Sequence, residues 1–354
     1  MAPLTQMAIV QPAPEDSKAL GLAVNQSTPV PKVHTRHRVL ILVLAVAINP
    51  TDHKMILHSN CPGGITGCDF CGIVEETTAK SGVSHLPPGI RVSGALFPYG
   101  LDECDNGAFA QYIVADSPLL VKVPEHWSDL EAASLGVGWS TLSLALSDPS
   151  ALGLEGTPTK PVHSKGDLVV IYGGGTASGT FGLSALGPHG LYSNRCNLYQ
   201  IGTVGDRHLH RRPQGSRTKA DPPRSRLHCG CRIRGDQSCG DRPHRRQVCT
   251  SRGIPVAWRT MKAAKVKEVM GFQVLGVDMN FGADSPYTRP ADEGLAEIGR
   301  QWAAEIEALM ESRKIKAYPL RELQDGWDGI IRGMEVLRKG ELQGQKLVVR
   351  IPQT

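Results

Sequence analysis

The stretch LVVIYGGGTASGTFGLSALG, residues 168–187, combines an apolar run, a glycine-rich turn and a run of small residues. The apolar run predicts a buried β-strand, and the small residues after the turn predict a helix that packs closely on that strand. A strand, a glycine turn and a helix in this order form the first βα unit of a doubly wound sheet. The stretch therefore predicts an α/β domain.

The glycine turn itself, GGGTASG at residues 173–179, is suited to phosphate binding. Without Cβ atoms the backbone can approach a pyrophosphate, and the amides at the following helix N-terminus supply hydrogen-bond donors. Thr176 and Ser178 add hydroxyl donors. Close packing of a helix on a strand requires the same glycines, so the turn alone leaves both interpretations open.

The length of the chain, 354 residues with 40% hydrophobic residues, is enough for two domains with separate cores. The apolar run RVLILVLAVAINP, residues 38–50, is shorter than the roughly 20 residues that span a bilayer. It also lies too far from the N-terminus for a signal peptide. We therefore expect a cytoplasmic protein without membrane association.

The pattern of short runs divides the chain into a β-rich part and an α/β part. Residues 1–160 show short β-prone runs separated by turns, which predicts a compact β-rich domain. The stretch SDLEAASLGVGWSTLSLAL, residues 128–146, opens with a Ser-x-x-Glu capping box and predicts one helix between two domains. Residues 265–279 are typical of strands. We expect an amphipathic helix over 293–315, a second helix over 325–341 and a last strand over 345–351.

Residues 191–252 differ from the rest of the chain in charge. They carry 14 Lys and Arg residues against 4 Asp, a net charge of +10, so the remainder of the chain carries −5. Five of the nine cysteines also fall here, and an odd total argues against a disulfide framework. Over 191–258 neither a strand period nor a helix period is visible. Such a segment is typical of coding sequence read in the wrong frame or through a retained intron.

Two other interpretations of this segment are weaker. A metal cluster would use His228, Cys229, Cys231, Cys239, His244 and Cys249. Their spacings match no standard zinc finger. An arginine-rich arm for nucleic acid would carry interleaved aromatic residues or a regular face. We therefore expect neither a metal nor a nucleic-acid partner.

Two short motifs precede the glycine turn. The stretch INPTDHKM, residues 48–55, predicts a turn that leaves a buried strand and places Lys54 beyond it. A cation held there can stabilise a developing enolate or contact a cofactor phosphate, although most surface lysines are only solvated. The stretch GCDFCG, residues 67–72, has the C-x-x-C spacing of a zinc site but lacks a second pair of ligands. We interpret Cys68 and Cys71 as buried thiols.

Taken together and in this order, INPTDHKM, GCDFCGIVEE, IYGGGTASGT and LRKGELQGQKLVVRI resemble the medium-chain dehydrogenase/reductase superfamily. More closely, they resemble the fungal trans-acting enoyl reductases that serve highly reducing polyketide synthases. The resemblance covers residues 1–186 and 261–354. It implies a GroES-like catalytic domain at 1–160, a Rossmann cofactor domain at 161–290 and a return to the catalytic domain at 291–354. Since Gly-Cys-Asp stands where zinc-dependent relatives have Gly-His-Glu, the chain resembles the zinc-free branch.

The resemblance also implies NADPH as the hydride donor and, as substrate, an α,β-unsaturated polyketide thioester on the acyl carrier domain of the synthase. The implied cofactor-binding residues are Thr51, Asp52, His53, Lys54, Gly175, Thr176, Ala177, Ser178, Leu342 and Gln343. The implied substrate-binding residues are Thr141, Leu142, Ser143, Leu144, Ala145, Leu146, Gly271, Phe272, Gln273, Val274 and Leu275. Lys54 and Thr141 are the expected catalytic side chains.

The segment 191–258 departs from this family, in which the same region forms the second strand of the Rossmann sheet and those that follow. The predicted Rossmann domain is therefore disrupted in sequence after its first βα unit. Two alternative functions stay open: a synthase partner that has lost cofactor binding, and a quinone or enone reductase of the same superfamily. A nucleic-acid binder would instead show affinity that falls steeply with salt.

Overall fold

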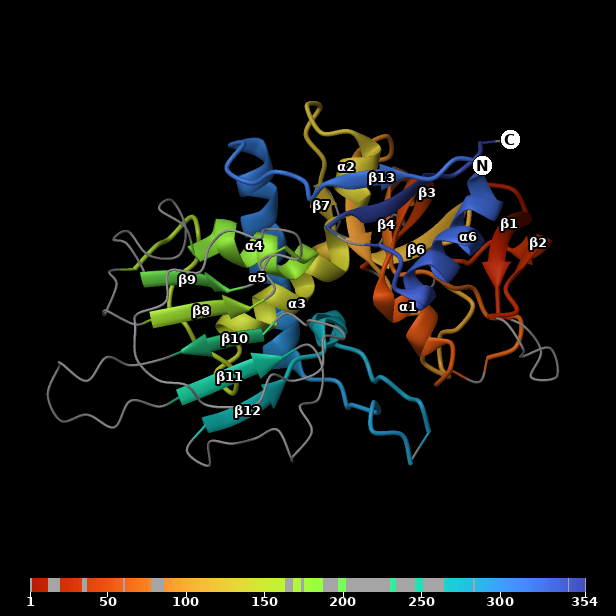
Figure 1. Ribbon diagram of the computed structural model, residues 1–354. Helices are drawn as coiled ribbons and strands as arrows, with labels where there is room; N and C mark the ends of the chain where they lie inside the picture. The colour runs from red at the N-terminus through yellow and green to blue at the C-terminus, as the bar shows by residue number, and fades with distance from the viewer. Residues whose placement is uncertain are drawn as a thin grey trace, which may run out of the picture.

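The structure, a computed structural model, has two large sheets with helices packed between them and a separate two-stranded pair (Figure 1). The described residues are 2–11, 20–33, 37–59, 61–77, 86–162, 168–172, 175–186, 197–201, 230–233, 246–250, 264–282, 284–342 and 344–353. Within them, no helix is both long enough and apolar enough to cross a bilayer.

A seven-stranded sheet forms the first domain around its longest strand, β3 (Arg38–Ile48). The strand order is β13-β14-β3-β4-β5-β7. The seventh strand, β6, stands outside this order and pairs antiparallel with the first half of β3. The other strands are β4 (Asp69–Thr77), β5 (Arg91–Ala95), β6 (Tyr112–Asp116), β7 (Val121–Lys122), β13 (Leu320–Glu322) and β14 (Lys346–Arg350). A separate antiparallel pair is formed by β1 (Thr5–Val10) and β2 (Ala23–Pro29). The β-prone runs of the sequence thus form one antiparallel sheet with a parallel edge at β13.

The C-terminal strand β14 lies directly beside β3, so the last residues of the chain belong to the first sheet. Figure 1 shows the two chain ends close together on the side of that sheet. Helix α6 (Gly326–Lys339) precedes β14 and contacts α1 (Pro50–Met55) and β14. The predicted domain boundaries near residues 160 and 290 stay predictions.

The connection between the domains contains two helices instead of the single helix predicted. Helix α2 (Asp129–Ala133) begins at the predicted capping box, in which the Glu131 amide donates to the Ser128 Oγ at 3.3 Å. The helix stops at Ser134, and α3 (Gly136–Ser147) begins two residues later. Since Gly136 lies against backbone atoms of a neighbouring strand, tertiary packing breaks a helix that the local pattern would continue.

The second sheet has five strands in the order β12-β11-β10-β8-β9. Its strands are β8 (Leu168–Tyr172), β9 (Asn197–Ile201), β10 (Gly230–Ile233), β11 (Arg246–Thr250) and β12 (Ala264–Glu268). The predicted βα unit is present, because β8 leads into α4 (Ala177–Leu186) and then into β9, which pairs parallel to β8. Strand β10 pairs antiparallel to β8, and β11 pairs parallel to β12.

Three strands, β9, β10 and β11, lie within residues 191–258, where no strand period is visible in the sequence. Their short runs are held by pairing with β8 and β12, which a search for sequence period does not detect. The remainder of 191–258 lies outside the described residues.

Two further elements link the sheets. The predicted strand over 265–279 is only partly present, because β12 ends at Glu268 and a 3₁₀ helix, η4 (Gly271–Leu275), follows. Helix α5 (Glu293–Glu311) packs against α3 and η4, and a second 3₁₀ helix, η2 (Ser117–Leu119), lies against it. Helix α3 therefore lies between the two sheets and contacts α4, α5 and η4 (Figure 1).

Candidate active site

The stretch INPTDHKM forms a short helix, α1, instead of the predicted turn. Pro50 occupies its first turn, where a missing amide hydrogen costs little. The side chain of Asp52 folds back to accept the amide of Asn49 at 2.7 Å, and this bond fixes the point where β3 ends and α1 begins. Lys54 is partly exposed in the last turn of this helix.

Asp52 is fully buried, and its carboxylate accepts hydrogen bonds from other residues of the protein. The Tyr99 hydroxyl donates to Asp52 Oδ1 at 2.9 Å and accepts the Gly67 amide at 3.1 Å. Burial raises the pKa of Asp52 to about 6, against the hydrogen bonds from the Asn49 amide, Cys68 and Tyr99, which lower it. Burial likewise raises the pKa of the Cys68 thiol. The assignment of Asp52 to the cofactor stays a prediction; its visible role is to hold α1.

We expect the stability contributed by Asp52 to increase as the pH falls. Its folded pKa of about 6 lies above the ordinary value of 3.8, so the folded state binds this proton more tightly than the unfolded state does. Relative to Asp52→Asn, the wild type should gain about 2 kcal/mol of unfolding free energy between pH 7 and pH 4. Urea unfolding of both proteins at several pH values measures this, and a constant difference between them would contradict it.

The N-terminus of α4 carries the residues predicted to hold the cofactor pyrophosphate. Gly175, Thr176, Ala177 and Ser178 are all partly exposed. The Thr176 Oγ1 accepts the Gly179 amide at 3.1 Å, and the Tyr318 hydroxyl donates to the Gly175 carbonyl. The first amides of a helix have no acceptor within the helix, so this end offers donors to an anion. These residues fit the pyrophosphate of a nicotinamide cofactor.

The first half of α3 is where the predicted site segments meet. Val137 packs against the hydrophobic cluster that contains Met55 of α1. A Cβ on Gly138 would lie 3.1 Å from Phe181 and 3.8 Å from Ala177, at the start of α4. One turn later, a Cβ on Gly271 of η4 would lie 2.5 Å from Thr141 Oγ1. Residues far apart in sequence thus converge on one turn and a half of helix.

The predicted substrate residues divide into partly exposed and buried groups. The partly exposed ones are Thr141, Ala145, Gln273 and Leu275. The buried ones are Leu142, Ser143, Leu144, Leu146, Gly271, Phe272 and Val274. The buried members of α3 belong largely to the core that joins the domains, so their contact with an acyl chain stays a prediction.

The predicted residues at the C-terminal side are only partly described. Leu342 is partly buried and packs against the same hydrophobic cluster as Ile56, which follows α1. Gln343 lies outside the described residues. Thr51 is partly exposed and His53 is 9% exposed. Their contact with a cofactor stays a prediction.

An aromatic cluster beside α1 and η4 was missed by the sequence analysis. The rings of Phe97 and Phe272 lie 4.7 Å apart, and Phe281 and Tyr287 complete the group. The cluster packs with Met55 and Cys68, so it forms an apolar wall next to the helix that carries Lys54. Its members come from the loop after β5, from η4 and from the segment between η4 and α5, and no local pattern connects them.

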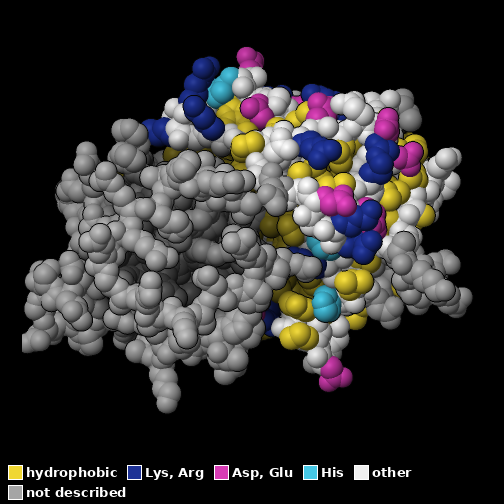
Figure 2. Space-filling view, viewed as in Figure 1, with side chains coloured by type: hydrophobic (Ala, Val, Ile, Leu, Met, Phe, Trp, Pro, Cys, Tyr) yellow, Lys and Arg dark blue, Asp and Glu magenta, His cyan; other side chains and the backbone are white. Residues whose placement is uncertain are grey.

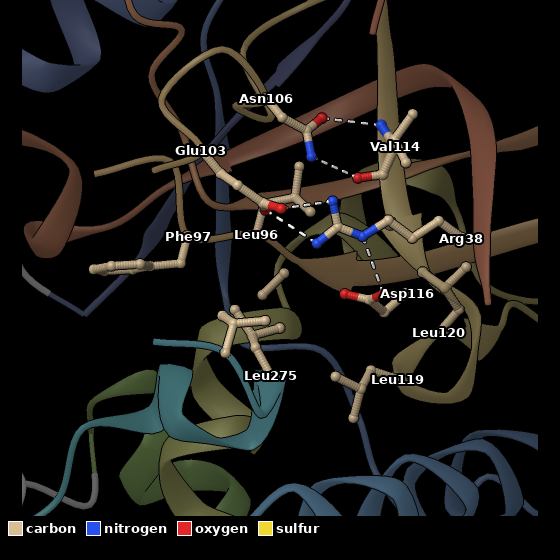
Figure 3. Close-up of a pocket in the computed structure, with 13 residues that line it drawn as sticks. Arg38, Leu96, Phe97, Glu103, Asn106, Val114, Asp116, Leu119, Leu120 and Leu275 are labelled. Atoms are coloured by element: carbon tan, nitrogen blue, oxygen red, sulfur yellow. Dashed lines mark hydrogen bonds and ion pairs between the residues drawn. The ribbon is translucent and has the colours of Figure 1, made fainter. Parts of the chain in front are cut away.

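Two hollows lie near these segments without forming the site. One cavity has a volume of about 30 Å³. Figure 3 shows Arg38, Glu103 and Asp116 on one side of it and Leu275 on the other. This volume admits a water molecule and no acyl chain. A groove of about 920 Å³ runs between residues 117–126 and α5, and none of the predicted site residues line it.

The early cysteines are free thiols. Cys61, Cys68 and Cys71 are buried, and Cys104 is partly exposed. Cys68 and Cys71 pack into different hydrophobic clusters. In the described part of the chain, no group of three or more His, Cys, Asp or Glu side chains is arranged to hold a metal ion. On the face shown in Figure 2, basic and acidic side chains of the described residues are interspersed.

Comparison with known proteins identifies the family. Residues 35–125 match the alcohol dehydrogenase GroES-like domain. The chain is 50% identical over 366 residues to the trans-enoyl reductase calK of Penicillium decumbens, and the match covers 98% of each chain. The chain belongs to the trans-enoyl reductase family. The enzyme class predicted from the sequence, an oxidoreductase acting on a carbon–carbon double bond, is confirmed.

Other trans-enoyl reductases and a solved structure extend the match. The trans-enoyl reductase sthE of Phaeosphaeria nodorum is 37% identical over 361 residues, covering 98% of this chain and 97% of that protein. A putative zinc-dependent alcohol dehydrogenase from Rhizobium etli CFN 42 matches with a TM-score of 0.65 at 15% identity, over 99% of each chain. At this identity the likeness shows the fold alone. The predicted superfamily and two-domain fold class are confirmed.

Proposed function

We propose that the protein reduces α,β-unsaturated polyketide thioesters with NADPH, on the acyl carrier domain of a separate highly reducing polyketide synthase, in the cytoplasm. The observation that carries the proposal is the convergence of α1, the N-terminus of α4 and η4 on residues 137–141 of α3. Membership of the trans-enoyl reductase family supports it.

The cofactor, when bound, supplies the hydride that adds to the β-carbon of the enoyl thioester. The α4 N-terminus holds its pyrophosphate through main-chain amides and the Thr176 and Ser178 hydroxyls. Charge then develops on the thioester oxygen, where Lys54 and Thr141 stabilise it. The α-carbon receives its proton from water or from one of these side chains. The aromatic cluster around Phe97 excludes water from this side of α1.

The Thr141 hydroxyl has one visible partner. It donates to the Val137 carbonyl at 2.8 Å. To donate to a developing oxyanion it must exchange this hydrogen bond, which a hydroxyl does by rotating about one bond. The proposed role therefore requires no change in the backbone of α3.

We expect Lys54→Ala to lower kcat/KM for enoyl reduction more than tenfold, which corresponds to about 1.4 kcal/mol of transition-state stabilisation. The reason is the loss of a cation beside the developing enolate. NADPH consumption with an enoyl N-acetylcysteamine thioester measures it. The control is Lys314→Ala, which removes an exposed lysine three residues after the end of α5. Equal kcat/KM in both variants would reduce Lys54 to a surface charge.

The alternatives are separated by two further measurements. A titration of the protein with NADPH, followed by nicotinamide fluorescence, tests the non-catalytic alternative, which predicts no saturable binding. A comparison of kcat/KM for the enoyl thioester and for a benzoquinone tests the quinone reductase alternative. Higher kcat/KM for the quinone would overturn the proposed substrate class.

A further inference from the structure

A buried ion pair between β4 and β14 lies next to the proposed site, and neither of its residues has been given a role so far. Asp69, the first residue of β4, is 0% exposed, and Lys346, the first residue of β14, is 6% exposed. The Lys346 Nζ donates to Asp69 Oδ2 at 2.9 Å. The side chain of Asn49 lies between α1 and this pair and is also buried.

The two carboxylate oxygens of Asp69 hold two different elements. Oδ2 accepts the Asn49 Nδ2 at 2.8 Å, and Asn49 precedes the first residue of α1. Oδ1 accepts the Val137 amide at 2.7 Å, in the first turn of α3. A Cβ on Gly136 would lie 2.5 Å from Oδ1, so only a glycine lets the helix approach the carboxylate this closely.

Lys346 fixes the orientation of the Asn49 amide. An ammonium group donates and cannot accept, and its Nζ donates to the Asn49 Oδ1 as well as to Asp69. The amide oxygen of Asn49 therefore faces Lys346, and its NH₂ group faces Asp69. In this way a residue of the C-terminal strand sets the hydrogen bond that holds the start of α1.

We propose that Asp69 and Lys346 are positioning residues that hold α1 and α3 at a fixed distance, and so hold Lys54 in register with Thr141. This inference rests on the proposed function. A buried ion pair is often no more stabilising than apolar residues of the same volume. A contribution to stability is therefore a weak explanation for the Asp69–Lys346 pair. The hydrogen bonds of Asp69 to α1, α3 and β14 explain the pair better, because they are directional and an apolar contact would not set the relative orientation of these elements.

The test compares Lys346→Met with Arg350→Met, a matched change on the same strand that breaks only exposed ion pairs. In Lys346→Met we expect kcat for enoyl reduction to fall tenfold or more, with KM for NADPH changed less than threefold. Amide hydrogen exchange in residues 49–55 and 137–141 should become at least tenfold faster. In Arg350→Met both readouts should stay within twofold of the wild type.

A double variant separates positioning from stability. Asp69→Leu with Lys346→Met replaces the pair by two apolar side chains, so no buried charge is left unpaired and the melting temperature should rise relative to Lys346→Met. A leucine accepts neither the Asn49 side chain nor the Val137 amide, so kcat should stay low. Recovery of kcat together with the melting temperature would overturn the proposal and leave a purely structural role.

The exchange measurement also keeps this inference distinct from the proposed function. If wild-type protein does not reduce the enoyl thioester, the proposed function fails. Exchange in 49–55 and 137–141 then still reports whether Lys346 holds both elements. Unchanged exchange at both segments in Lys346→Met would overturn the inference even in a fully active enzyme.

Discussion

Gly271→Ala should lower kcat/KM for the enoyl thioester about a hundredfold, or about 2.7 kcal/mol of transition-state stabilisation. The added Cβ would lie 2.5 Å from Thr141 Oγ1, 2.8 Å from the Thr141 amide and 3.0 Å from its Cα. Two of these three atoms are backbone of α3, so the side chain cannot simply rotate away. Either η4 or Thr141 must move by about 1 Å, a displacement that costs catalysis heavily when it moves a reacting group.

The control for this substitution is Gly100→Ala. Its Cβ would meet nothing closer than 3.7 Å, which is ordinary van der Waals contact. Steady-state kinetics of both variants, with a melting curve to verify folding, give the comparison. If Gly271→Ala keeps wild-type kcat/KM, the contact between η4 and Thr141 does not set the reacting geometry.

Trp302→Ala should lower the free energy of unfolding by about 3–5 kcal/mol. Trp302 is 1% exposed in α5, within the core that joins the two sheets, and its Nε1 donates to the Ser147 Oγ of α3 at 2.8 Å. The substitution leaves a cavity and a hydroxyl without its donor. Because α5 and α3 are both helices between the sheets, the loss weakens the junction of the domains.

Urea unfolding measures this effect. The control is Leu4→Ala, because Leu4 is 90% exposed and should change the unfolding free energy by less than about 0.5 kcal/mol. A loss below about 1 kcal/mol for Trp302→Ala would mean that the core around α5 relaxes to fill the cavity.

The elements with a strong local pattern were predictable from sequence. The helix over 293–315 appears as α5, the glycine stretch appears as β8 followed by α4, and the capping box at Ser128 marks the start of α2. Each depends on residues a few positions apart, so the sequence contains the information directly. The same holds for Thr176, which caps α4 within the predicted phosphate turn.

The elements that depend on distant contacts were not predictable in this way. In β3, the pairing register with β4 shifts between Val43 and Ala45. The residues of β3 that belong to one hydrophobic cluster have odd numbers before the shift and even numbers after it: Val39, Ile41 and Val43, then Val46 and Ile48. A simple alternation of faces therefore fails within a single strand. The η4 helix is similar, because Gly271 is held against Thr141 by packing that no local period reveals.

The candidate site was predicted as separate motifs, and its supporting residues were missed. Lys54 was named from its turn motif and from the family resemblance, and Thr141 from the resemblance alone. Asp69 and Lys346 lie within quoted motifs but were given no role, and Tyr99 lies outside these motifs. A buried lysine at the start of a terminal strand and an aspartate in the Gly-Cys-Asp stretch become meaningful only when β14 lies beside β3. The pairing joins residues nearly 300 positions apart.

The pairing of β14 with β3 also sets the order in which a newly synthesised chain can complete its fold. The edge of β3 at residues 45–48 has its partner only after residues 347–350 have left the ribosome. At about 5–20 residues per second, this backbone edge stays open for roughly 15–60 s. During that time Asp69 also lacks its buried cation, and an unpaired strand edge is prone to associate with other chains. A polypeptide chain that is truncated before Lys346 therefore cannot complete this sheet.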